Sequence, residues 1–163
     1  MRPWYWMACA ALLTVGCQAE IPPSAPPVAT DFPSVDTFTF DEIDIVGCGL
    51  TLIAPDTNSY TDGLYLFSGL PDEPETGTGS MRMKLDGEIV NFVRTETSGL
   101  EIIGGQFTSQ TFVSQDGRTT VVVDITQTTP QPDPEVLAID AATLRLEQDS
   151  GILTLGLVGD TGC

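Results

Sequence analysis

The stretch MRMKLDGEIVNFV, residues 81–93, decides the fold because apolar and polar side chains alternate on both sides of an Asp-Gly pair. Such a pair between alternating runs predicts a two-residue β-hairpin turn, since both positions take a positive φ. The resulting register pairs Met81 with Phe92, Met83 with Val90, Leu85 with Glu88 and, on the opposite face, Arg82 with Asn91. One face of the hairpin is therefore apolar, which indicates an antiparallel sheet that covers a core.

Two further hairpins are expected downstream. One turns at Asp116-Gly117 and sets Phe112 opposite Val121 and Gln110 opposite Val123, with Val121, Val123 and Ile125 on one inner face. The other joins residues 142–148 to 152–158 through Asp149-Ser150-Gly151. Alternation predicts earlier strands over residues 37–40, 43–46, 50–53 and 64–67, and turn-forming residues predict exposed loops over 69–80 and 128–135.

These strands predict an all-β fold. About eight to ten short antiparallel strands are typical of a β-sandwich or a small β-barrel, and the sequence favours neither over the other. Long helical patterns are absent from residues 35–163, so we expect one acidic all-β domain over this range.

The N-terminal segment 1–16 has the order of a secretory signal, with Arg2, an apolar run over residues 4–15, and Gly16 directly before Cys17. The run is shorter than the ~20 residues that a membrane-spanning helix needs. The sequence LTVGC, residues 13–17, resembles the lipobox of bacterial lipoproteins. This resemblance implies cleavage before Cys17 and a diacylglycerol with palmitate-type chains on its sulfur. The alternatives are a plain cleaved signal with a free Cys17, or a buried N-terminal helix.

A proline-rich segment follows the cysteine. Residues 18–34 hold five prolines and little that could pack, which predicts an extended tether over residues 17–34. Lipoproteins kept at the inner membrane typically carry aspartate where Gln18 stands. The resemblance therefore implies a lipid anchor in a bilayer of the cell envelope, namely the outer membrane of a diderm bacterium.

The charge is strongly negative, with 6 basic against 23 acidic residues and a net charge of −17. A domain of this charge repels polyanions, so nucleic acid is a poor partner. Cationic proteins, amines and divalent cations are favoured at long range. The acidity is also consistent with a role in solubility alone.

Two cysteines remain for the domain once Cys9 leaves with the signal and Cys17 is acylated. Disulfides persist outside the cytosol, so we expect Cys48 to pair with Cys163. The alternatives are two free thiols or half of a metal site.

The residue types available restrict the chemistry. The chain has no histidine, which removes the commonest general base, serine and cysteine triads, and nearly all zinc sites. We expect no catalytic residues, no cofactor and no metal. A carboxylate-based hydrolase remains an alternative, because paired carboxyl groups can cleave glycosides.

The segment from Asp56 to Gly63 alternates oxygen-bearing side chains like the start of a calcium loop, but Thr61 stands at its turn-glycine position and Phe67 at its glutamate position. We interpret it as an ordinary polar turn. Asp41, Glu42 and Asp44 are likewise expected to form a solvated strand edge, and most of the aromatic residues that remain after the signal is removed are expected at core positions.

Residues 48–123 resemble the membrane-bound inhibitors of C-type lysozyme, which are small lipoproteins with a disulfide-closed β-barrel. The similarity lies in Cys48, the hairpin of residues 81–92, Ser98-Gly99, and FVSQDG at residues 112–117. In that family the Ser-Gly serine and a later lysine enter the lysozyme cleft, which implies Ser98 and Gln115 as binding residues. Gln115 replaces that lysine, Val113 replaces a tryptophan, and the family's tyrosine after Ser-Gly is missing.

Three functions follow. The leading hypothesis is a membrane-anchored, non-catalytic binding or structural module. The second is a lysozyme-inhibitor-like protein that binds a cationic hydrolase. The third is the carboxylate-based hydrolase.

Overall fold

The computed structural model describes residues 32–43, 47–69 and 81–162. Its elements are β1 (Val35–Asp36), the 3-10 helix η1 (Phe40–Glu42), β2 (Gly49–Ile53), β3 (Leu66–Gly69), β4 (Met81–Leu85), β5 (Glu88–Glu101), β6 (Phe107–Ser114), β7 (Thr120–Pro130), β8 (Val136–Gln148) and β9 (Gly151–Gly162). Within these ranges, none of the helical segments has the length and apolarity to cross a membrane.

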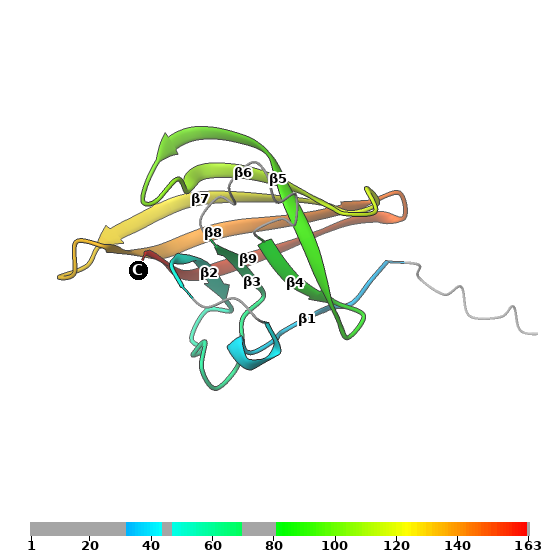
Figure 1. Ribbon diagram of the computed structural model, residues 1–163, viewed down its shortest axis with the longest axis horizontal. Helices are drawn as coiled ribbons and strands as arrows, with labels where there is room; N and C mark the ends of the chain where they lie inside the picture. Colours follow the sequence, from blue (N-terminus) through cyan, green and yellow to red (C-terminus); the bar gives the residue numbers. More distant parts are fainter. Residues whose placement is uncertain (1–31, 44–46, 70–80, 163) are drawn as a thin grey trace, which may run out of the picture.

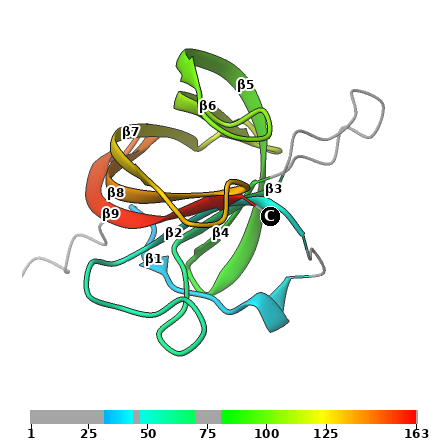
Figure 2. The ribbon, with the colours of Figure 1, turned by 90° about the vertical axis from the view of Figure 1, so that its left-hand side faces the viewer.

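Eight strands form a closed antiparallel barrel. They are hydrogen-bonded in the order β4-β3-β2-β9-β8-β7-β6-β5, and β5 pairs with β4 to close the ring. Figure 2 shows this ring, and Figure 1 shows the long strands β7, β8 and β9 side by side while β5 crosses over them. The additional strand β1 pairs with the end of β4. The all-β prediction is confirmed, and of the two expected architectures the structure has the small barrel.

The hairpin of β4 and β5 has the predicted register. Met81 lies opposite Phe92, Met83 opposite Val90 and Leu85 opposite Glu88. Asp86 and Gly87 take the positive φ values of 50° and 79° that a two-residue turn requires. Met81, Met83 and Phe92 are all fully buried inside the barrel.

The other two predicted hairpins are also present. Phe112 pairs with Val121 and Gln110 with Val123, as expected from the Asp116-Gly117 turn. In the third hairpin the strands are longer than predicted, because β8 begins at Val136 and β9 continues to Gly162. The turn itself is also shorter by one residue, since Gly151 already pairs with Gln148.

Two loop boundaries differ from the expectation. The predicted loop over residues 128–135 is wrong at its start, because Thr128, Thr129 and Pro130 still pair with β8. A proline at the last position of a strand removes only one donor, so it ends the pairing without preventing it. The predicted loop over residues 69–80 is wrong at Gly69, which is the last residue of β3, and residues 70–80 lie outside the described residues.

The N-terminal region also departs from the predicted strands. Residues 37–40 do not form one: β1 ends at Asp36, Phe38 makes a single bridge to Leu64, and η1 begins at Phe40. The Thr39 N–H donates to the Glu42 carboxylate over 2.9 Å, which is half of a capping box and favours the helical turn over an extended strand. Of the expected strand at 43–46, residues 44–46 lie outside the described residues.

Two apolar clusters hold the domain together. The main cluster fills the barrel, and its members are Leu50, Leu52, Leu66, Met81, Met83, Leu85, Phe92, Phe112, Val121, Val123, Ile125, Ile139, Ala142, Leu144, Leu146 and Leu157. The second lies on the outer face, where Phe38 and Ile43 of the N-terminal segment cover Leu64 and Phe67. In the described part of the chain, side chains therefore fill the barrel interior, and the outer face is partly covered.

Residues before the expected domain start at residue 35 already contact the barrel. Phe32 packs against the main cluster, and the Ser34 N–H donates to the Asp86 carboxylate over 2.8 Å. The last residues of the expected tether thus already contact the barrel.

Candidate functional site

The site with the most distinctive chemistry is a groove on the outer face of the barrel. It consists of two adjoining hollows of about 400 Å³ and about 200 Å³. Both are lined by Phe40, Gly47, Tyr60 and Phe67, and we call the combined feature the outer groove. Figure 1 shows why it forms here, because η1 and the loop over residues 54–63 both lie on the same outer side of β2 and β3.

The floor of the outer groove is a row of side chains from three neighbouring strands. Thr51 on β2 lies opposite Phe67 on β3 and also opposite Asp160 on β9. Directly opposed residues of antiparallel strands point to the same face of the sheet. Phe67, Thr51 and Asp160 therefore form one line, with an aromatic ring at one end and a carboxylate at the other.

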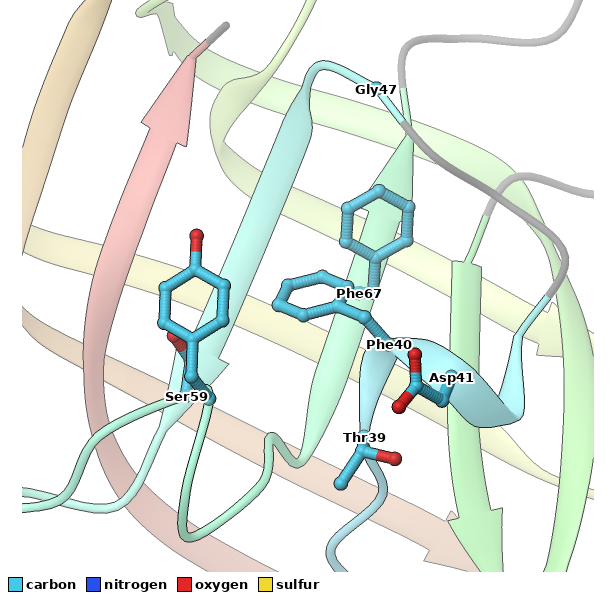
Figure 3. Close-up of a pocket in the computed structure, with 7 residues that line it drawn as sticks. Thr39, Phe40, Asp41, Gly47, Ser59 and Phe67 are labelled. Atoms are coloured by element: carbon cyan, nitrogen blue, oxygen red, sulfur yellow. The ribbon is translucent and has the colours of Figure 1, made fainter.

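Aromatic rings form the walls. The Phe40 ring centroid lies 5.9 Å from that of Phe67 at an interplanar angle of 82°, and 5.9 Å from that of Tyr60 at 45°. Figure 3 shows the Phe40 and Phe67 side chains meeting in the groove, with Asp41 on the opposite side of Phe40 from Ser59. Tyr60 is 81% exposed, so its ring adds an uncovered aromatic surface to the groove.

The wall formed by η1 is held by charge as well as by packing. Lys84 on β4 donates to the Glu42 carboxylate. This hydrogen bond, followed by the one from the Thr39 N–H, lowers the pKa of Glu42 below its usual value. Glu42 therefore anchors η1 to the barrel, and the expected solvated strand edge at Asp41 and Glu42 is instead a turn of 3-10 helix.

The wall that carries Tyr60 is the expected polar turn. The Asn58 side-chain oxygen accepts from the Tyr60 N–H over 2.8 Å, and the Asp62 carboxylate accepts from the Asn58 N–H over 2.8 Å. These oxygens are used inside the turn, and they fix the position of Tyr60. Among the residues that the structure describes, no group of three or more His, Cys, Asp or Glu side chains is arranged to hold a metal ion.

Among the described residues, Asp160 and Asp41 are the acidic ones that line the outer groove. Burial raises the pKa of the Asp160 carboxyl above its usual value, and none of the salt bridges in the described part of the chain involves it. Asp160 is still exposed, so solvent screens much of this effect, and a cation can approach the carboxylate. Asp160 also lines a third hollow of about 390 Å³, together with Asp56 and Asp140.

No protein-family model, curated protein or solved structure matches this chain.

The structure does not bring the two predicted binding residues together. Ser98 on β5 pairs with Ser109 near the start of β6, whereas Gln115 follows Ser114, the last residue of β6. At about 3.3 Å per residue, the two positions are on the order of 20 Å apart along the strand. Both are exposed, and neither lines the outer groove.

The three predicted cysteine positions are only partly described. Cys48, directly before β2, is disulfide-bonded. Cys163 and the lipidation residue Cys17 lie outside the described residues. The pairing of Cys48 with Cys163 and the acylation of Cys17 stay predictions.

The groove residues were not singled out from the sequence. The expected core position of Phe67 is confirmed, Phe40 packs against the same cluster, and no sequence motif surrounds Asp160. The informative signal was the register, because Phe67, Thr51 and Asp160 become neighbours only when β3, β2 and β9 are known to be adjacent.

Proposed function

We propose that this chain is a lipid-anchored cell-envelope protein whose acidic β-barrel binds a partner at its outer groove without catalysing a reaction. The anchor is supported by the signal-like segment 1–16, the lipobox-like LTVGC ending at Cys17, and the proline-rich residues that follow. A lipid anchor and an extended tether would hold the domain at the surface of the outer membrane of a diderm bacterium.

The observation that carries the binding role is the contrast between the interior and the outer face. Small barrels bind ligands inside only where the interior is left open. Here large side chains such as Phe92, Phe112 and Leu144 fill the interior and are fully buried. The outer groove, by contrast, presents exposed aromatic surface beside a carboxylate. A ligand would therefore be bound on the outer face.

The anchor is tested by metabolic labelling of the native host protein with a palmitate analogue, followed by membrane fractionation. We expect label on the wild-type chain and its recovery with the outer membrane. A Cys17→Ser variant should carry no label and should no longer be recovered with the outer membrane. Recovery of a mature chain with an unmodified Cys17 thiol would refute the anchor.

The binding role is tested by affinity capture from the native envelope with three baits. They are the anchored wild-type chain, Tyr60→Ala, and Glu96→Gln as a remote control on β5. A partner that binds at the outer groove should be retained by wild type and Glu96→Gln and lost with Tyr60→Ala. Equal capture by all three baits would place binding elsewhere on the surface.

One observation favours the alternative of a carboxylate-based hydrolase. Asp56, Asp140 and Asp160 line one hollow, and burial raises the pKa of Asp160, as a general acid requires. This alternative predicts hydrolysis of a glycoside panel that is abolished by both Asp160→Asn and Asp140→Asn. Absence of turnover by the wild-type protein would eliminate it.

The lysozyme-inhibitor alternative is supported by the net charge of −17, which attracts a cationic hydrolase. It predicts a loss of lysozyme activity on incubation with the chain at low salt, and a recovery of activity with Ser98→Ala. Full residual lysozyme activity would rule it out.

A further inference from the structure

We propose that the outer groove binds an arginine or lysine side chain presented by a cationic protein partner, with the aromatic rings contacting the side chain and Asp160 contacting its charge. This inference rests on the proposed binding role and names the chemistry that the groove would recognise.

The dimensions of the floor fit such a side chain. Neighbouring strands are about 4.8 Å apart, so Phe67 and Asp160, two strands apart on either side of Thr51, are separated by roughly 10 Å. Phe67 is only 2% exposed, so a long basic side chain would place its methylene groups against the rings of Phe40 and Tyr60 and its charged end at Asp160. Thr51 between them is only 7% exposed, so the floor is closed beneath the ligand.

The walls favour a cation over a neutral apolar group. A guanidinium or ammonium group is attracted to the face of an aromatic ring within about 6 Å of its centroid. Phe40 and Tyr60 line both hollows with ring centroids 5.9 Å apart, and the buried Phe67 ring lies 5.9 Å from that of Phe40. Arginine is favoured further, because its planar group can stack on a ring and donate to a carboxylate at once.

The charged residues around the groove also favour a cationic ligand. Among the described residues that line its two hollows, Asp41 and Asp160 are acidic and none is lysine or arginine. The nearby Lys84 is already paired with Glu42. Arg82 lies opposite Phe67 on β4, on the side away from Asp160, and its guanidinium donates to the Met81 carbonyl oxygen. A cationic ligand would thus meet a carboxylate that forms no salt bridge with any of the described residues.

The test uses the exported chain with Cys17→Ser, which keeps every other residue and removes the lipid. Acetyl-Gly-Arg-Gly-amide and acetyl-Gly-Lys-Gly-amide are titrated while the backbone amide signals are followed by NMR. Acetyl-Gly-citrulline-Gly-amide is the matched neutral control. We expect saturable shifts at Thr51, Tyr60 and Asp160 with either basic peptide and none with the citrulline peptide.

Substitutions then locate the site. We expect Tyr60→Ala to weaken binding about two- to fivefold, which is the range of an exposed cation–π contact. Asp160→Asn should weaken it about tenfold, because it removes a charge-assisted contact. Glu96→Gln removes the same charge far from the groove and should change the affinity less than about twofold.

Other outcomes would overturn the inference. Non-saturating shifts spread over the acidic surface would show general charge attraction only. Equal binding of the citrulline peptide would show that the groove selects shape rather than charge. Retention of a native partner that depends on Tyr60, without binding of either basic peptide, would leave the proposed function standing and refute the ligand class.

Discussion

Gly49 on β2 lies directly opposite Gly162 on β9. A Cβ at Gly49 would lie 2.5 Å from the Ser68 carbonyl oxygen, and one at Gly162 would lie 2.1 Å from the Glu135 carbonyl oxygen. The two strands therefore approach their other neighbours so closely that only glycine fits at this end. In the sequence, Cys48 directly precedes Gly49 and Cys163 directly follows Gly162.

This pairing leads to a prediction for the disulfide. A bond between Cys48 and Cys163 closes nearly the whole domain into one loop, which stabilises by about 4–5 kcal/mol on the chain-entropy model. We expect reduction, or Cys48→Ser with Cys163→Ser, to lower the free energy of unfolding by up to that amount. Thiol alkylation and mass spectrometry of the exported protein check the bond, and two free thiols would contradict it.

Gly159 gives a prediction with a built-in control. A Cβ there would lie 1.9 Å from the Thr51 carbonyl oxygen, so Gly159→Ala must displace β9 from β2. We expect a loss of about 1–3 kcal/mol of stability, the usual cost of overpacking. Gly156 on the same strand has open space around it, so Gly156→Ala should leave stability nearly unchanged. Equal urea midpoints for the two variants would disagree with this geometry.

Asp160 should make the protein less stable as the pH rises. Burial raises its folded-state pKa above the unfolded value, so the folded chain holds this proton to higher pH. The free energy of unfolding therefore falls as the pH rises from about 4 through the folded pKa. We expect Asp160→Asn to remove this loss and raise stability at pH 7, measured by urea unfolding across pH. A destabilised Asp160→Asn would instead indicate a favourable contact of the carboxylate.

Glu42 and Asp116 should have the opposite effect on the pH dependence, because they make the protein less stable as the pH falls. Hydrogen bonds from Lys84 to Glu42 and from the Ser114 hydroxyl to Asp116 lower both pKa values. Their stabilisation is present above the unfolded pKa of about 4 and is lost as the pH falls through the folded values. We expect Glu42→Gln to reduce the drop in melting temperature between pH 5 and pH 3, whereas Glu96→Gln should retain it.

The barrel strands could be predicted where neighbouring residues in the sequence determine both the turn and the alternation. The hairpins at Asp86-Gly87 and Asp116-Gly117 each combine a turn that needs positive φ with alternating flanks, and both registers are confirmed. The strand predicted over residues 37–40 is wrong. Its apolar residues alternate because they pack on the outside of the barrel, while Thr39 and Glu42 cap a helical turn. Local alternation does not distinguish these two situations.

The outer groove could not be predicted for a related reason. It depends on which strands are adjacent, and β2 pairs with β9, which is almost the length of the domain away in sequence. Tyr60 was placed correctly in a polar turn, but its contact with Phe40 requires η1 and the turn to meet on one face. Such contacts between distant segments leave no periodic pattern in the sequence.

The pairing of β2 with β9 also sets an order of events in biosynthesis. The ring cannot close until the last strand, ending at Gly162, has been delivered, because β9 separates β2 from β8. Pairing between such distant segments is slow to form and does not begin on an incomplete chain. A chain exported through a narrow channel, as proposed for this one, must stay unfolded on the way, and this topology would delay closure of the barrel until β9 has emerged on the far side.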